Sequence, residues 1–154
     1  MQRAFVFPGQ GSQIVGMGHD LANNFSVARE VFEEIDDSLG EKLSKLIFYG
    51  SEEELRLTRN TQPAMLAMSI AVVRIIESEH KKNINDFVEV VAGHSLGEYS
   101  ALAATGAINV QDAANLLRLR GEAMQNAVPV GEGAMAALIG ANIKTAEKII
   151  ELSS

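Results

Sequence analysis

The sequence reads Phe87-Val88-Glu89-Val90-Val91-Ala92-Gly93-His94-Ser95-Leu96-Gly97 just after the middle of the chain. Residues 87–92 are rich in β-branched side chains, which predicts a buried interior strand. Residues 95–105 are typical of a helix that ends at Gly106. Residues 93–97 match G-x-S-x-G, the pattern of a serine on a sharp turn between a strand and a helix.

The chemistry of such a turn makes Ser95 a candidate nucleophile. The turn is so tight that the residues two before and two after the serine must be small, and both are glycine. The hydroxyl then projects at a helix N-terminus, where free N–H groups and the helix dipole favour an oxyanion. We expect the N–H of Leu96 to be one oxyanion donor. The alternative is that Ser95 is only an N-cap in a glycine-rich turn, and the strand-to-helix context favours the nucleophile.

The elements on either side of this turn predict an α/β fold. Further strands are expected at residues 4–7 and 134–139. A helical region is expected at about 17–46, with breaks near 23–24 and 40, and a short helix at 51–55 with Ser51 as its N-cap. A long helix is expected from Thr61 as N-cap, with Pro63 in its first turn. Two more helices are expected, one from Asn109 to about 127 and one at 142–152. Strands that alternate with helices imply parallel pairing. A boundary at 129–133 separates a core, residues 1–128, from the start of a smaller unit, residues 129–154.

The composition excludes several classes of function. The net charge is −7 and the basic residues are scattered, so we expect no nucleic-acid partner. The chain has no cysteine, which excludes disulfides, thiolate catalysis and cysteine-bound metals. The most apolar helix, about 64–76, contains Arg74 and is shorter than a membrane span. The first residues form too short an apolar run for a signal peptide, and we expect a cytoplasmic protein.

A glycine loop follows the first predicted strand. A dinucleotide-binding pattern fails because Ile14 stands where its third glycine belongs, and no Gly-Lys-Ser/Thr follows for a phosphate loop. Gly9 and Gly11 would instead let backbone N–H groups approach a ligand closely. Gln10 is then a candidate for the second oxyanion N–H. The alternative is a purely structural turn.

Arg120 stands out on the helix that follows. Its neighbours at helical spacing are all apolar: Leu116, Leu117, Ala123 and Met124. This predicts an inward-facing guanidinium that needs a carboxylate, either from the protein or from a ligand. Spacing alone slightly favours an ion pair within the protein. Arg118, by contrast, is expected at the surface near Glu122.

A serine nucleophile also needs a base, usually histidine. The chain has only three, His19, His80 and His94. His94 adjoins Ser95 and leaves the backbone in another direction, and His80 lies in a charged stretch. His19 has no reason to fold back onto Ser95. We expect none of them to be the base.

Several separate motifs resemble the malonyl-CoA:acyl carrier protein transacylases in type and order. They are Phe7-Pro8-Gly9-Gln10-Gly11-Ser12-Gln13, Thr61-Gln62-Pro63-Ala64, Gly93-His94-Ser95-Leu96-Gly97-Glu98, Arg120-Gly121, Met124-Gln125, Ala127-Val128-Pro129 and Gly133-Ala134-Met135. The resemblance implies a hydrolase-like α/β core and a smaller ferredoxin-like subdomain. It implies that Ser95 takes malonyl from coenzyme A and passes it to the phosphopantetheine thiol of acyl carrier protein in fatty-acid synthesis. No cofactor or metal ion is implied.

The resemblance also implies residue roles. Gln10 and Leu96 match the backbone oxyanion donors, and Arg120 matches the arginine that binds the malonyl carboxylate. Gln62 lies in a family motif without an assigned catalytic role. Family members are considerably longer, and their catalytic histidine lies beyond residue 154. We therefore expect an N-terminal part of such an enzyme, with little transacylase activity by itself.

Two other functions stay open at this point. The first is a serine esterase or other hydrolase, which shares G-x-S-x-G and resolves the acyl-enzyme with water. The second is an inactive fragment that only binds acyl carrier protein. A malonyl adduct on Ser95 would argue against the second, and the acyl selectivity of Arg120 variants would separate transfer from hydrolysis.

Overall fold

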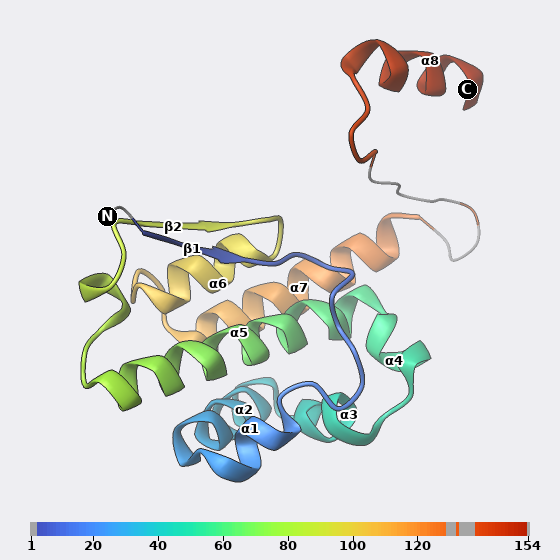
Figure 1. Cartoon of the computed structure of the whole chain (residues 1–154). Helices are drawn as coiled ribbons and strands as arrows, with labels where there is room; N and C mark the ends of the chain where they lie inside the picture. The colour runs from blue at the N-terminus through green and yellow to red at the C-terminus, as the bar shows by residue number, and fades with distance from the viewer. Residues whose placement is uncertain (1–2, 129–131, 133–137, 154) are drawn as a thin grey trace.

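Helices pack against a small parallel sheet that lies at one side of them in the computed structural model, which describes residues 3–128, 132 and 138–153 (Figure 1). The strands are β1 (Ala4–Phe7) and β2 (Val90–Gly93). The helices are α1 (His19–Asn24), α2 (Ser26–Leu39), α3 (Leu43–Tyr49), α4 (Glu52–Arg56), α5 (Thr58–His80), the 3₁₀ helix η1 (Ile84–Asp86), α6 (Gly97–Ala104), α7 (Val110–Ala127) and α8 (Ile143–Ser153). The predicted parallel pairing is confirmed, with Phe7 opposite Gly93. Both strands therefore send their following loops to the same edge of the sheet.

The second strand differs from its prediction. It begins at Val90, because residues 83–86 form a capped 3₁₀ turn in which Asn83 and Asp86 bond to each other's backbone. It is also not buried: Val90 is 57% exposed and Val6 on β1 is 74% exposed. The sheet formed by the described residues thus has one open face.

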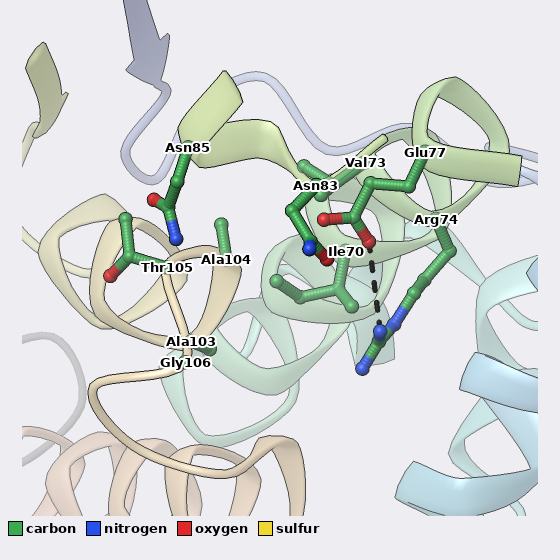
Figure 2. Close-up of a pocket in the computed structure, with 10 residues that line it drawn as sticks. All are labelled: Ile70, Val73, Arg74, Glu77, Asn83, Asn85, Ala103, Ala104, Thr105 and Gly106. Atoms are coloured by element: carbon green, nitrogen blue, oxygen red, sulfur yellow. Dashed lines mark ion pairs between the residues drawn. The ribbon is translucent and has the colours of Figure 1, made fainter. Parts of the chain in front are cut away.

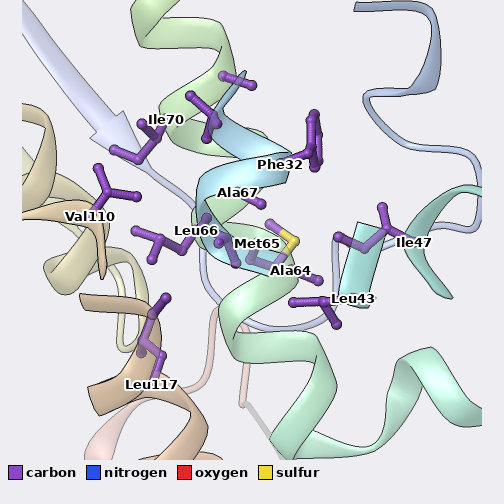
Figure 3. Packing of buried hydrophobic residues seen from close by; sticks show 14 of the residues in the cluster. Phe32, Leu43, Ile47, Ala64, Met65, Leu66, Ala67, Ile70, Val110 and Leu117 are labelled. Atoms are coloured by element: carbon purple, nitrogen blue, oxygen red, sulfur yellow. The ribbon is translucent and has the colours of Figure 1, made fainter. Parts of the chain in front are cut away.

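The long helix α5 is the centre of the core, as its apolar sequence predicts. It packs against α2, α6 and α7 (Figure 3). The fully buried side chains include Ile35, Ile47, Leu66, Ile70 and Leu117. The predicted Ser51 and Asn109 caps are confirmed, since each side chain accepts the N–H three residues later.

The predicted start of α5 is wrong. The helix begins at Thr58, and Thr61 is buried inside it, where its hydroxyl donates to the Leu55 carbonyl at 2.6 Å. Pro63 is therefore interior, where it lacks the N–H that would reach the carbonyl of Arg59. Arg118 Nη1 on α7 donates to that carbonyl at 2.7 Å instead. A side chain from a neighbouring helix thus satisfies the group that the proline leaves free.

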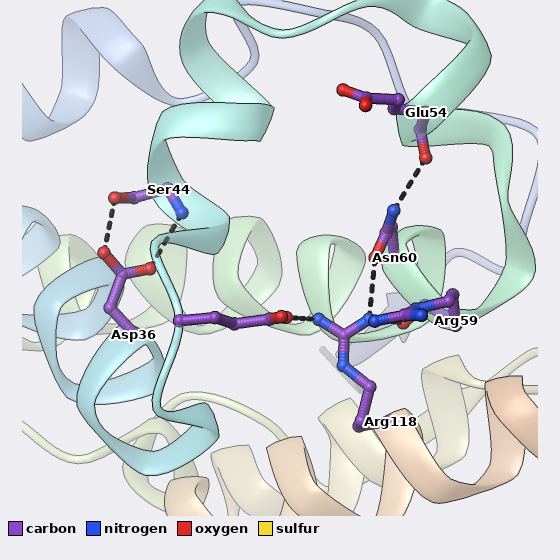
Figure 4. Close-up of polar contacts among 7 residues, drawn as sticks. Asp36, Ser44, Glu54, Arg59, Asn60 and Arg118 are labelled. Atoms are coloured by element: carbon purple, nitrogen blue, oxygen red, sulfur yellow. Dashed lines mark hydrogen bonds and ion pairs between the residues drawn. The ribbon is translucent and has the colours of Figure 1, made fainter.

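Arg118 is a structural residue, which corrects the prediction that it lies at the surface. Its side chain is 12% exposed and pairs with Glu41, and it also donates to the Asn60 amide oxygen at 2.7 Å (Figure 4). Burial lowers the pKa of its guanidinium, and the charge of Glu122 opposes that shift. Nearby, buried Asp36 accepts two bonds from Ser44, one from its backbone N–H and one from its hydroxyl, which ties α2 to α3.

Gly121 sets how closely α7 approaches the start of α5. A Cβ at this position would lie 2.6 Å from the Arg59 Cα and 2.7 Å from the Thr58 carbonyl oxygen. These atoms are backbone and cannot turn aside. Glycine at position 121 therefore brings the side chains on either side of it against α5.

We expect Gly121→Ala to lower the free energy of unfolding by about 2 kcal/mol, because the added methyl overpacks the contact between two helices. Urea denaturation of the chain measures this. Asn126→Ala on the exposed side of the same helix is the control, and we expect its effect to stay within about 0.5 kcal/mol. Equal stability of the Gly121→Ala protein and the original would contradict the close approach.

The C-terminal part is only partly described. The predicted strand at 134–139 lies outside the described residues except for its last two positions. The predicted helix at 142–152 is confirmed as α8, and Asn142 accepts the Thr145 N–H at its start. Throughout the described ranges, no helix has the length and apolar character that crossing a membrane requires.

Candidate active site

Ser95 occupies a strained turn between β2 and α6. Its φ is +56°, and the only other non-glycine residue with positive φ in the described ranges is Lys81. The N-cap of α6 is Leu96, and no side chain forms a cap hydrogen bond at this helix start, so the Ser95 hydroxyl does not serve as a cap there. An L-residue adopts this backbone region at a cost, and such strain clusters at functional sites. Ser95 is exposed to solvent.

The flanking glycines are required, as predicted. A Cβ on Gly93 would overlap the carbonyl group of Gly97. A Cβ on Gly97 would overlap the Phe7 carbonyl and lie 2.8 Å from that of Pro8. The turn is therefore closed on itself and packed against the end of β1.

The glycine loop after β1 lies directly beside this turn. Gly9 is buried, and a Cβ on it would lie 2.9 Å from the His94 carbonyl oxygen. Ser12 steadies the loop by donating from its hydroxyl to the Gly9 carbonyl at 3.1 Å. The N–H groups of Gln10 and Leu96 donate to no hydrogen bond among the described residues. Both candidate oxyanion donors thus stand at the same sheet edge as Ser95, without protein partners there.

Arg120 reaches the serine from α7. Its Nη2 donates to Ser95 Oγ at 3.0 Å, and its Nη1 donates to Gln62 Oε1 at 2.7 Å. The predicted inward-facing stripe is only partly correct, because Arg120 is half-buried, while Leu116 is 45% exposed and Met124 is 37% exposed. No carboxylate in the described ranges forms an ion pair with Arg120. The ion pair that spacing slightly favoured belongs to Arg118 instead.

Gln62 is the site residue that sequence reasoning left without a role. It is fully buried on α5, between the guanidinium of Arg120 and the sulfur of Met124, to which its Nε2 donates at 3.3 Å. The signal that could have found it is a polar amide at the start of the most apolar stretch of the chain.

The histidines lie where the sequence suggested. His19 Nε2 bonds to the Tyr49 hydroxyl at 2.5 Å, and His80 is exposed beside the Phe87 ring. His94 is exposed, and within the described part of the chain no histidine hydrogen-bonds to Ser95. None of the three is placed as its base.

Two pockets of the described surface are lined by α5 and lie at different places along it: one includes Phe7 and Pro8 at the end of β1, and the other lies at the opposite end of α6 from Ser95. The second pocket, of about 140 Å³, lies between the C-terminal ends of α5 and α6, where Arg74 and Glu77 pair at 3.6 Å beside Asn83, and Asn85 lies across from them near Thr105 (Figure 2). Glu77 also accepts the Ile84 N–H at 2.9 Å, so its carboxylate supports the local backbone. In the ranges that are described, no group of three or more His, Cys, Asp or Glu side chains could hold a metal ion.

Known proteins with related sequences cover almost all of the chain. The acyl transferase domain family matches residues 4–151. The malonyl CoA-acyl carrier protein transacylase of Bacillus subtilis is 49% identical over 148 residues, which are 96% of this chain and 45% of that protein. The enzyme of the same name from Escherichia coli K12 is 47% identical over 150 residues, which are 97% of this chain and 47% of that protein. The chain therefore spans about half the length of the curated relatives that it matches.

Solved structures agree in fold and in extent. An acyl-carrier-protein-S-malonyltransferase from Bartonella henselae superposes with a TM-score of 0.92 and 56% identity, over 99% of this chain and 48% of that one. A malonyl-transacylase solved in complex with a type II PKS acyl-carrier protein has a TM-score of 0.88 and 45% identity, with the same coverage of both chains. The helices and the small parallel sheet described above are thus an acyltransferase-like arrangement.

Proposed function

Because the chain belongs to the acyl transferase domain family, we propose that it carries the nucleophile of an enzyme that transfers malonyl from coenzyme A to the phosphopantetheine thiol of acyl carrier protein. The observation that carries this proposal is the 3.0 Å contact between Arg120 Nη2 and Ser95 Oγ. It places a cation that forms no ion pair with any carboxylate of the described residues directly beside a strained serine. An acyl group with its own carboxylate, such as malonyl, complements that pair.

The proposed reaction has two halves. Ser95 Oγ attacks the thioester carbonyl of malonyl-CoA, its proton passes to a base, and the oxyanion is stabilised by the N–H groups of Gln10 and Leu96. The C–S bond breaks, and coenzyme A leaves as the protonated thiol. The phosphopantetheine thiol then attacks the Ser95 ester by the reverse steps, which frees the serine. The family resemblance assigns the base to a histidine other than His19, His80 and His94.

Arg120 provides the proposed acyl selectivity. An arginine and a carboxylate form two parallel hydrogen bonds with charge assistance. An acetyl group would leave the guanidinium without that partner. Malonyl-CoA is therefore expected to bind in preference to acetyl-CoA.

The finer architecture is also proposed. Residues 1–128 correspond to the start of a hydrolase-like core, since β1 and β2 are parallel and the nucleophile turn follows β2. Residues 129–154 correspond to the beginning of a ferredoxin-like subdomain that contains α8. We further propose that the protein acts in the cytoplasm in fatty-acid synthesis. The low transacylase activity expected of the 154 residues alone stays a prediction.

The test follows one malonyl group through both halves of the proposed reaction. The complete gene product is incubated with malonyl-CoA, and intact mass spectrometry and peptide mapping are expected to find one malonyl group on Ser95. Addition of holo acyl carrier protein then removes it and yields malonyl carrier protein. Apo acyl carrier protein, which lacks the phosphopantetheine thiol, is the control and leaves the adduct in place. Release of free malonate without transfer would indicate a hydrolase, and carrier-protein binding without any adduct would indicate a binding protein.

A further inference from the structure

We infer that Gln62 is a positioning residue that holds the Arg120 guanidinium beside Ser95 without cancelling its charge. It thereby sets the preference for an acyl group that bears a carboxylate. This inference rests on the proposed role of Arg120. The observation behind it is a continuous chain of contacts from Met124 through Gln62 and Arg120 to Ser95.

The orientation of the Gln62 amide is fixed from both ends. A guanidinium has only N–H donors, so the group that faces Arg120 must be the amide oxygen, which lies 2.7 Å from Nη1. The amide NH₂ then meets Met124 Sδ at 3.3 Å, and a thioether sulfur is a weak acceptor. A flipped amide would point its donors at the donors of Arg120. Since Gln62 is fully buried, water does not offer an alternative partner.

The two arginines of α7 show what the amide contributes. Arg118 has a carboxylate partner, Glu41, and serves the packing of α5 against α7. Arg120, one helical half-turn away, has the neutral Gln62 as its partner on α5. A carboxylate at position 62 would satisfy both the hydrogen bond and the charge, and a substrate carboxylate would then have to compete with it. The amide satisfies only the hydrogen bond, so the positive charge remains for a ligand.

Holding the guanidinium in place also lowers the loss of freedom on binding. Arginine has a long side chain with many rotamers, and immobilising it weakens binding. The bond to Gln62 immobilises it before the substrate arrives. The predicted consequence is an effect of Gln62 mainly on the KM for malonyl-CoA.

The test measures kcat/KM of the complete gene product for malonyl-CoA and for acetyl-CoA. We expect Gln62→Glu to lower the malonyl-to-acetyl ratio about 100-fold, because the new carboxylate neutralises Arg120. We expect Gln62→Met, which keeps the volume and removes the acceptor, to lower it about 10-fold through KM. The matched control is Thr61→Val, which removes an equally buried polar group from the same helix. We expect that variant to lose stability and keep the ratio.

A further variant changes Met124, the partly exposed residue that contacts the Gln62 amide. Met124 is 37% exposed, so Met124→Leu preserves the fold while it removes the acceptor of the amide NH₂. We expect a ratio about 3-fold lower, which tests the inference even where the buried Gln62 variants fail to fold.

The outcomes separate the inference from the proposed function. If Arg120→Ala lowers the ratio and the Gln62 and Met124 variants leave it unchanged, the inference is wrong and the proposed function stands. If Thr61→Val lowers the ratio as much as Gln62→Met, Gln62 acts only through packing. If Arg120→Ala itself leaves the ratio unchanged, the proposed role of Arg120 is wrong and the inference falls with it, whereas the malonyl adduct on Ser95 and its transfer test the proposed function separately.

Discussion

Ser95→Ala will lower kcat for malonyl transfer by at least about 10⁴-fold and abolish the malonyl adduct, because the variant lacks the hydroxyl that is proposed to form the acyl-enzyme. Ser95→Gly will do the same. The measurements are the rate of carrier-protein acylation and the intact mass after exposure to malonyl-CoA. An adduct that persists in either variant would place the nucleophile elsewhere.

The same two variants also report on the strain of the turn. Ser95 has φ +56°, which alanine adopts at a cost and glycine adopts freely. Both variants lose the hydrogen bond from Arg120. The difference between their free energies of unfolding therefore reports the cost of the positive φ at this position. We expect Ser95→Gly to be about 1 kcal/mol more stable than Ser95→Ala in urea denaturation.

Lys81 provides the matched control for strain without function. It has φ +52° at the C-cap of α5. We expect Lys81→Gly to be more stable than Lys81→Ala by a similar amount, with malonyl transfer unchanged in both. A stability gain at position 81 without one at position 95 would mean that the nucleophile turn is not strained.

Local signals predicted the geometry of the turn at Ser95 well, because that geometry depends on residues close in sequence. Gly93 and Gly97 are needed for contacts within the turn and with the end of β1. The caps at Ser51 and Asn109 likewise depend on a bond three residues away. Such features depend on residues a few positions apart in the sequence, so they can be predicted without knowledge of the fold.

The errors arose where a distant element changes a local preference. Thr61 and Pro63 are both typical of a helix start, yet α5 begins earlier. The Thr61 hydroxyl finds its acceptor on α4, and the carbonyl that Pro63 leaves free finds its donor on Arg118, 59 residues from Arg59. No local pattern records these partners.

The two arginines of α7 illustrate the same limit. Helical spacing shows which residues share a face, but it does not show how the helix is rotated about its axis. That rotation depends on Gly121, which lets α7 approach the backbone of Arg59. It turns Arg118 toward Glu41 and Arg120 toward Ser95. The resemblance implied a ligand-binding role for Arg120, which spacing alone did not favour, and that role stays a prediction.

Arg120→Met will lower kcat/KM for malonyl-CoA by about 10³-fold and leave acetyl-CoA no worse. Methionine keeps much of the side-chain volume and removes the charge and all five N–H donors. The malonyl carboxylate then enters the site without a partner, whereas acetyl no longer leaves a cation unpaired. For Arg120→Lys we expect a kcat/KM for malonyl-CoA between those of the original protein and Arg120→Met, because lysine keeps the charge and loses the planar fork. Single-turnover loading of Ser95 from each acyl-CoA measures the effect.

Arg118→Met is the control that separates charge selectivity from the general loss of an arginine on α7. It removes a guanidinium side chain that is 12% exposed, pairs with Glu41 and donates to the Arg59 carbonyl, so we expect lower stability. It does not contact Ser95, so the malonyl-to-acetyl ratio should stay as it is. If Arg120→Met reduces loading from both acyl-CoAs equally, Arg120 supports the fold or the serine and does not recognise the substrate carboxylate. A loss confined to malonyl-CoA, with the Arg118 variant unaffected in its ratio, would instead identify the 3.0 Å contact between Arg120 and Ser95 as a recognition site for an acyl carboxylate.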